Sequence, residues 1–130
     1  MSKQYIDLVK KVYAAGAAGD WDALEEYLHP DFAVVEPDSA PYVGRFEGIE
    51  GFKEVFGIVF SFYDELTLDH RAFCSGDNHV MVLLGFGGKS KKTGESFEVD
   101  MIEMFEIKDD KLVEIKPFYF NTDTLHKMAP

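Results

Sequence analysis

A single acidic residue ends the first stretch of the chain that has the composition of a strand. Residues 32–35 read Phe-Ala-Val-Val, Glu36 follows, and Pro37 comes next. Apolar and β-branched residues favour a buried strand, and proline cannot continue a sheet ladder. We therefore predict that Glu36 lies at the inner end of a strand, at the mouth or floor of a pocket. There it either takes part in chemistry or only closes the strand.

A second acid and a tyrosine stand among apolar residues. Alternation over residues 96–107 predicts a long strand, and Glu103 falls between Met101 and Phe105 on its apolar face. A carboxyl in such surroundings is desolvated, which raises its pKa. The alternative is an acid on a solvated face or beside a lysine. Tyr13 ends an apolar stripe on a predicted helix, so it is either a core residue or a hydroxyl that reaches a cavity.

Periodicity predicts the elements that position these residues. Apolar residues recur every three or four positions over 5–18, 21–28 and 49–63, which indicates three helices, the second closed by Pro30. Alternation predicts strands over 66–73, 79–86, 96–107 and 112–120. Residues 37–42 read as a loop, 44–48 as a short strand or link, and 122–128 as a short terminal helix or tail.

This order of elements predicts an α+β fold in one domain, residues 1–130. Three N-terminal helices would pack on the concave face of a curved, mainly antiparallel sheet. A sheet that curves around helices leaves a conical cavity, which suits a small hydrophobic ligand. The length of 130 residues is that of a single domain.

Composition narrows the classes of partner. The formal net charge of −11 disfavours nucleic acid and anionic lipid. Cys74 is the single cysteine, so no intramolecular disulfide can form. There is no run of 18 apolar residues and no signal-peptide pattern at the start, so we expect a cytoplasmic protein that does not contact membranes. The spacing of His, Cys, Asp and Glu predicts no metal site, and we expect no cofactor.

The order and spacing of several short motifs resemble the NTF2-like superfamily, and within it the SnoaL-like and ketosteroid-isomerase-like branch. The motifs are Gly-Asp-Trp-Asp at 19–22, His-Pro-Asp-Phe at 29–32, the acid–proline pair at 36–37, the Phe-rich third helix, and the turn and strand at 110–119. The resemblance covers nearly the whole chain and implies the NTF2-like cone. This fold hosts isomerases, cyclases, dehydratases, hydrolases and non-enzymatic binders.

The resemblance also implies roles for individual residues. Glu36 stands at the position of the general base, and Glu103 at the position of a protonated acid that donates a hydrogen bond to an oxyanion. The oxyanion tyrosine of the isomerases falls on Val12, one residue before Tyr13, and its supporting tyrosine is replaced by Phe56. The resemblance thus implies that the carboxyl pair is present and the tyrosine network of the isomerases is not.

These observations give two candidate functions. The first is a cofactor-independent isomerase, cyclase or dehydratase that moves a proton on a hydrophobic carbonyl substrate, with catalytic Glu36, Glu103 and Tyr13. The second is a non-catalytic ligand-binding or dimerisation domain. In either case the residues expected to contact the ligand are Phe56, Phe60, Phe105, Tyr119 and His70. We also expect a homodimer formed through the sheet, because Ile102 and Met104 place apolar side chains on the face opposite the pocket.

Overall fold

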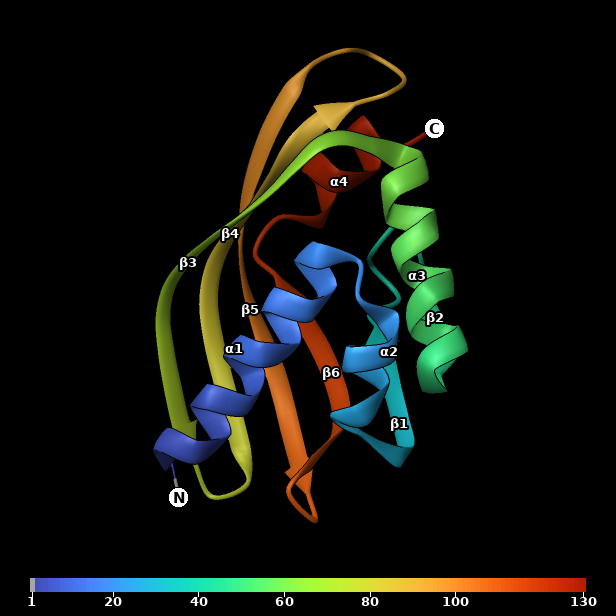
Figure 1. Ribbon diagram of the computed structural model, residues 1–130. Coiled ribbons are helices and arrows are strands. Elements are labelled where there is room, and N and C mark those ends of the chain that lie inside the picture. The colour runs from blue at the N-terminus through green and yellow to red at the C-terminus, as the bar shows by residue number, and fades with distance from the viewer. Residues whose placement is uncertain (1) are drawn as a thin grey trace.

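The computed structural model describes residues 2–130 and shows helices packed against one curved sheet (Figure 1). The elements in chain order are α1 (Ser2–Ala18), α2 (Trp21–Glu26), β1 (Leu28–Glu36), β2 (Gly44–Glu47), α3 (Gly48–Phe62), β3 (Tyr63–Gly76), β4 (His79–Ser90), β5 (Ser96–Lys108), β6 (Lys111–Tyr119) and α4 (Thr122–Met128). The predicted α+β class is confirmed.

The six strands form one sheet in the order β2-β1-β6-β5-β4-β3. Every neighbouring pair is antiparallel except β1 and β6, which run parallel. The predicted meander is the run from β3 to β6. Helix α1 contacts β3 and β4, whereas α3 contacts β1 and β2 (Figure 1). The two helices thus cover opposite ends of the same face of the sheet, and the space between them opens onto the central strands.

The prediction of three N-terminal helices is confirmed in part. Two helices precede β1 and the third, α3, follows β2 as its predicted range requires, but α2 has only six residues. The predicted second helix was too long, because Leu28 is already in β1 and pairs with Leu112 of β6. Pro30 lies where the β1–β6 register shifts, between Leu28 and Ala33, so its missing N–H breaks no regular ladder. The boundary between α2 and β1 depends on the pairing of β1 with β6, which helical periodicity cannot indicate.

The chain after β6 closes one end of the sheet. Asn121 caps the N-terminus of helix α4, and its side chain accepts a hydrogen bond from the Thr124 backbone N–H at 3.2 Å. Tyr63 was predicted on the third helix, but it begins β3 and is fully buried. Its hydroxyl donates to the Leu125 carbonyl at 3.0 Å, which fixes α4 against the start of β3.

No helix among residues 2–130 is both long enough and apolar enough to cross a membrane.

Candidate functional site

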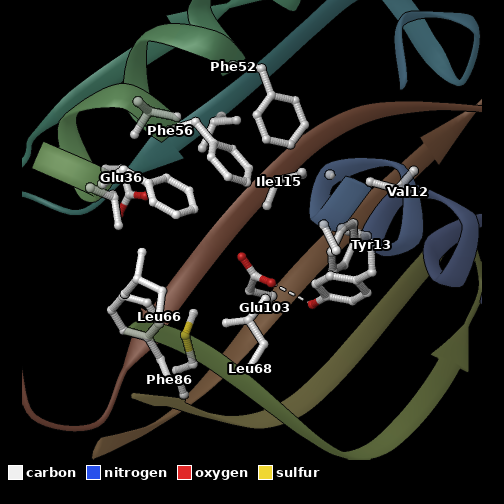
Figure 2. Close-up of a pocket in the computed structure, with 18 of the residues that line it drawn as sticks. Val12, Tyr13, Glu36, Phe52, Phe56, Leu66, Leu68, Phe86, Glu103 and Ile115 are labelled. Atoms are coloured by element: carbon white, nitrogen blue, oxygen red, sulfur yellow. Dashed lines mark hydrogen bonds between the residues drawn. The ribbon is translucent and has the colours of Figure 1, made fainter. Parts of the chain in front are cut away.

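A cavity of about 570 Å³ lies between the sheet and helices α1 and α3 (Figure 2). Its walls are mostly aliphatic and aromatic side chains. Two carboxyls interrupt this lining, those of Glu36 and Glu103, and no Lys or Arg among residues 2–130 lines it. An apolar cavity with a few convergent polar groups is the usual form of a small-molecule site.

Glu36 ends β1 and is almost completely buried, with 8% of its surface exposed. The hydroxyl of Tyr119 donates to its Oε1 at 3.0 Å. Burial raises the pKa of Glu36 to about 8, because the cavity destabilises the ionised form; the Tyr119 hydrogen bond acts in the opposite direction, and the charge of Glu103 raises the value again. The side chain is therefore a carboxyl that titrates close to neutral pH.

Glu103 projects into the same cavity from the middle of β5. Its strand neighbours on either side are Val82 of β4 and Pro117 of β6. The hydroxyl of Tyr13 donates to Glu103 Oε1 at 2.5 Å, as the dashed line in Figure 2 marks. Burial raises the pKa of Glu103, and the Tyr13 hydrogen bond opposes this rise. Glu103 can therefore stay protonated and accept from Tyr13 at the same time.

Two tyrosines thus donate hydrogen bonds to the acids, although the two positions at which the resemblance implies the isomerase tyrosines hold apolar residues. Val12 and Phe56 both line the cavity without a hydroxyl. Tyr13, one residue after Val12, reaches Glu103 instead, and Tyr119 from the last strand reaches Glu36. Burial strongly raises the pKa of Tyr13, so its phenol remains a hydrogen-bond donor.

All five residues expected to contact a ligand, namely Phe56, Phe60, Phe105, Tyr119 and His70, line the cavity. Phe60 is half-exposed and stacks on Phe56 with ring centroids 5.1 Å apart, so this pair forms part of the rim. The ring of His70 lies 4.2 Å from that of Tyr13, centroid to centroid. Burial lowers the pKa of His70, which favours a neutral imidazole.

Tyr42 is a cavity residue that the sequence did not single out. It follows a stretch of turn-forming residues, yet it is only 3% exposed and its ring packs against Phe62 and Tyr119. Its hydroxyl is buried and has no hydrogen-bond partner among residues 2–130. The only hint in the sequence was an aromatic residue in a loop that is otherwise rich in proline, serine and aspartate.

The site offers acid–base chemistry. Among residues 2–130 no group of three or more His, Cys, Asp or Glu side chains could hold a metal ion. A carboxyl that titrates near neutral pH can take a proton from a carbon acid, and a protonated carboxyl can donate to the oxygen on which charge develops.

Comparison with known proteins identifies the fold. A family model described as the SnoaL-like domain matches residues 9–115. An NTF2-like protein from Burkholderia thailandensis is 22% identical, with 97% of this chain and 98% of that chain covered and a TM-score of 0.86. TerC, co-crystallised with polyporic acid, is 21% identical over 96% of this chain and 97% of its own, with a TM-score of 0.84.

A third solved structure, from Jannaschia sp. CCS1 and described as a SnoaL-like polyketide cyclase, is 19% identical over 98% of this chain and 91% of its own, with a TM-score of 0.80. At these identities the three structures show the fold alone. No curated protein matches the chain. The predicted resemblance to NTF2-like and SnoaL-like proteins is confirmed.

Proposed function

Because the chain belongs to the SnoaL-like domain family and has the NTF2-like fold, we propose that its cavity moves a proton on a neutral, apolar carbonyl compound without a cofactor. The observation that carries this proposal is the placement of Glu36 and Glu103 in one apolar cavity, each hydrogen-bonded to its own tyrosine. Fold alone supports many functions, so the proposal depends on these side chains.

Glu36 is the proposed base. Tyr119 occupies its Oε1, which leaves Oε2 to take a proton from the carbon next to the carbonyl. The Tyr119 hydrogen bond favours the ionised carboxylate, whereas burial favours the neutral acid, and the balance gives a pKa of about 8. A base whose pKa lies near the working pH combines a usable ionised fraction with sufficient basicity.

Glu103 is the proposed hydrogen-bond donor to the carbonyl oxygen. In its protonated form it donates through one oxygen while Oε1 accepts from Tyr13. The hydrogen bond from Glu103 then stabilises the negative charge that develops on the substrate oxygen. The hydrogen bond from Tyr13 to Glu103 supports this effect, which is strong in a site of low dielectric. The proton that Glu36 removes returns to another carbon in an isomerisation. In a dehydration it leaves with a hydroxyl group as water. In a cyclisation the enolate carbon attacks a second carbonyl carbon of the substrate, the π bond of that carbonyl breaks, and the proton passes to the alkoxide that forms.

The lining supports a neutral, ring-containing substrate. Aromatic walls favour flat apolar groups, and the described lining has no cation that would neutralise a carboxylate or phosphate. The net charge of −11 opposes anionic ligands at longer range. The polyketide-cyclase description of the Jannaschia protein agrees with a substrate that carries carbonyl groups.

A second candidate function is ligand binding without turnover. One observation favours it: with a pKa of about 8, most Glu36 side chains are protonated at pH 7, so the cavity is close to neutral. A neutral apolar cavity can hold a ligand and leave it unchanged.

Hydrogen–deuterium exchange separates the two candidates. We expect the protein to accelerate exchange of the α-protons of 2-tetralone in D₂O, measured by NMR at pD 8. Glu36→Gln removes the base and should lower the rate at least about 100-fold. Glu103→Gln keeps an N–H donor and should cost about 10-fold, and Tyr13→Phe a similar factor.

Glu106→Gln is the matched control, because Glu106 lies on the same strand beside His79 and does not line the cavity. Its exchange rate should equal that of the unsubstituted protein. If the protein binds 2-tetralone but exchange stays at the buffer rate, the binding function replaces the enzymatic one.

We also propose that the outer face of the sheet pairs two copies of the chain. Leu83, Ile102 and Phe118 are cross-strand neighbours on β4, β5 and β6, and they are 40%, 41% and 55% exposed. Met104, expected on the same face, is only 7% exposed and is already covered within the chain. A row of exposed apolar side chains at the centre of a sheet supports a self-complementary interface.

A further inference from the structure

A second hollow, of about 500 Å³, lies beside the cavity and is open to solvent. It lies where the end of α1 and the start of α2 face α3 (Figure 1). No strand residue among residues 2–130 lines it, and the proposed chemistry does not use it. We call it the outer hollow, and its lining consists of Gly16, Ala17, Ala18, Gly19, Trp21, Lys53, Phe56, Gly57 and Phe60.

The cavity and the outer hollow share part of their walls. Both are lined by Gly16 and Ala17 of α1 and by Phe56 and Phe60 of α3. The two α1 residues have no side chain beyond Cβ, so the aromatic rings of α3 are the side chains that separate the two spaces. These rings stack on each other, and Phe60 is half-exposed. Because exposed side chains change rotamer within nanoseconds, a rotation of these rings can join the two spaces.

Gly16 leaves room for such a movement. A Cβ at this position would lie 3.9 Å from two atoms of the Phe56 ring, which is ordinary van der Waals contact. Packing therefore does not require glycine here, although glycine is less favourable than alanine within a helix. The missing side chain leaves space between the Phe56 ring and α1 that a methyl group would fill.

The lining of the outer hollow suits an apolar group. Trp21 lies edge-on to Phe56 with ring centroids 5.3 Å apart, so aromatic surface continues from the cavity into the hollow. Lys53 is the single charged residue of this lining among residues 2–130, and its Nζ lies 3.3 Å from Oε2 of Glu50. The ammonium thus already has a partner, and its hydrocarbon stem can cover an apolar ligand.

We propose that the outer hollow binds a hydrocarbon chain of the substrate, which leaves the cavity between the end of α1 and the rings of Phe56 and Phe60. The inference rests on the proposed function in taking a neutral, ring-containing carbonyl compound as the ligand. It narrows that class to compounds whose ring system carries a chain of several carbons. The ring system lies beside the two acids, and the chain lies against Trp21 and α3.

A binding experiment tests this without requiring turnover. Dissociation constants of 2-tetralone and 6-hexyl-2-tetralone, measured by calorimetry, compare the same ring system without and with a chain. The hexyl compound should bind the unsubstituted protein at least about 10-fold more tightly, because its chain leaves water.

Gly57→Leu fills the outer hollow without touching the cavity. Gly57 lines only the hollow, and a Cβ there meets no atom within 4 Å. The affinity of the hexyl compound should fall at least about 5-fold in this variant, while that of 2-tetralone stays unchanged. Gly16→Ala fills the space beside Phe56 and should also weaken the hexyl compound at least about 5-fold.

Glu54→Leu is the matched control. Glu54 is an exposed residue of the same helix and lines neither space, so the same new side chain should change neither affinity. Neither leucine variant should lower the urea midpoint, because both positions are exposed and leucine favours a helix.

The proposal is wrong if 6-hexyl-2-tetralone binds no more tightly than 2-tetralone, or if Gly57→Leu weakens both ligands equally or neither. It is also wrong if Glu54→Leu weakens the hexyl compound as much as Gly57→Leu does, because the chain would then lie elsewhere on α3. A protein that shows the expected affinities but exchanges no α-protons would refute the enzymatic function and leave the chain site standing. Exchange of 2-tetralone without any gain in affinity from the chain would refute the chain site alone.

Discussion

Each acid of the cavity accepts a hydrogen bond from a tyrosine that comes from a distant part of the chain. Tyr13 of α1 donates to Glu103 of β5, and Tyr119 of β6 donates to Glu36 of β1. Both carboxyls have raised pKa values, with burial as the largest cause. At the scale of single residues, the site therefore consists of two carboxyls with raised pKa values, each hydrogen-bonded to a phenol that stays neutral.

The first prediction concerns the pH dependence of the exchange rate. Because Glu36 must be ionised to accept a proton and its pKa is about 8, the rate for 2-tetralone should rise with pH and level off above about pH 8. An NMR exchange series from pH 5.5 to 9.5 measures this. A profile that levels off near pH 4.5, the ordinary value for a glutamate, would exclude a buried base.

The same pKa predicts how stability changes with pH. Glu36 ionises near pH 4.5 in the unfolded chain and near 8 in the folded protein, so unfolding releases a proton between these values. The free energy of unfolding should therefore fall as pH rises through this window. The stability that the protein gains from burying a neutral Glu36 is fully present only below about pH 4.5. In Glu36→Gln the free energy of unfolding should not show this fall, which amounts to a few kcal/mol at most. Urea unfolding at pH 5.5 and 8.5 measures the difference, and parallel curves for the two proteins would contradict it.

Sequence reasoning identified the acids more easily than their partners. Glu36 and Glu103 interrupt apolar stretches, and a polar residue in such a pattern is visible in the sequence. Tyr42 lies in a turn-rich segment, and no periodicity indicates which way a loop side chain points. Tyr119 was expected only to contact a ligand, because its bond to Glu36 depends on the parallel pairing of β1 with β6.

At the scale of elements, the site depends on how closely α3 approaches β2. Gly51 is buried in α3, and a Cβ at this position would lie 2.4 Å from the Phe46 carbonyl carbon. This close approach sets the height of α3 above the sheet, and α3 supplies Phe52, Phe56 and Phe60 to the cavity.

We predict opposite effects for two glycines of the same helix. Gly51→Ala forces α3 away from the Phe46 backbone and should lower the free energy of unfolding by about 2–4 kcal/mol. Gly57→Ala meets no atom within 4 Å and should raise it by about 0.5–1 kcal/mol, because alanine favours the helix. Urea denaturation compares the two, and equal effects would show that α3 does not rest on β2 as described.

The elements that the sequence predicted well are those with long, regular patterns. The 17-residue α1 and the meander from β3 to β6 follow directly from the periods of 3.6 and 2. The end of α2 was predicted wrongly because Leu28 fits the apolar stripe of the helix and the first pair of β1 equally well. A contact with Leu112, more than 80 residues later, decides between them, and such long-range pairing leaves no local signal.

At the scale of the whole molecule, the two faces of the sheet have different surroundings. The inner face is covered by helices and encloses the cavity, whereas the outer face exposes the row Leu83, Ile102 and Phe118. Beside this row Arg71 contacts Asp69, Glu98 and Asp100, which gives the outer face an ionic border. An apolar centre with a charged rim is the usual anatomy of a protein–protein interface.

A charge placed in the centre of this row should prevent self-association. We expect the unsubstituted protein to elute as a dimer in size-exclusion chromatography with light scattering at micromolar concentration, and Ile102→Lys to elute as a monomer with its fold intact by circular dichroism. Val43→Lys is the control, because Val43 is also half-exposed but lies in the loop before β2. A monomeric unsubstituted protein would refute the interface.

The buried acids also set a limit on how stable this fold can be. Two carboxyls in an apolar cavity lose hydration on folding, and their tyrosine partners restore only part of it. A sequence selected for stability alone would place leucine or methionine at both positions, with phenylalanine at residues 13 and 119. The chain thus keeps a destabilising pair of groups at the centre of its core. A thermostabilised redesign that fills the cavity would gain stability by discarding the two acids on which the proposed function depends.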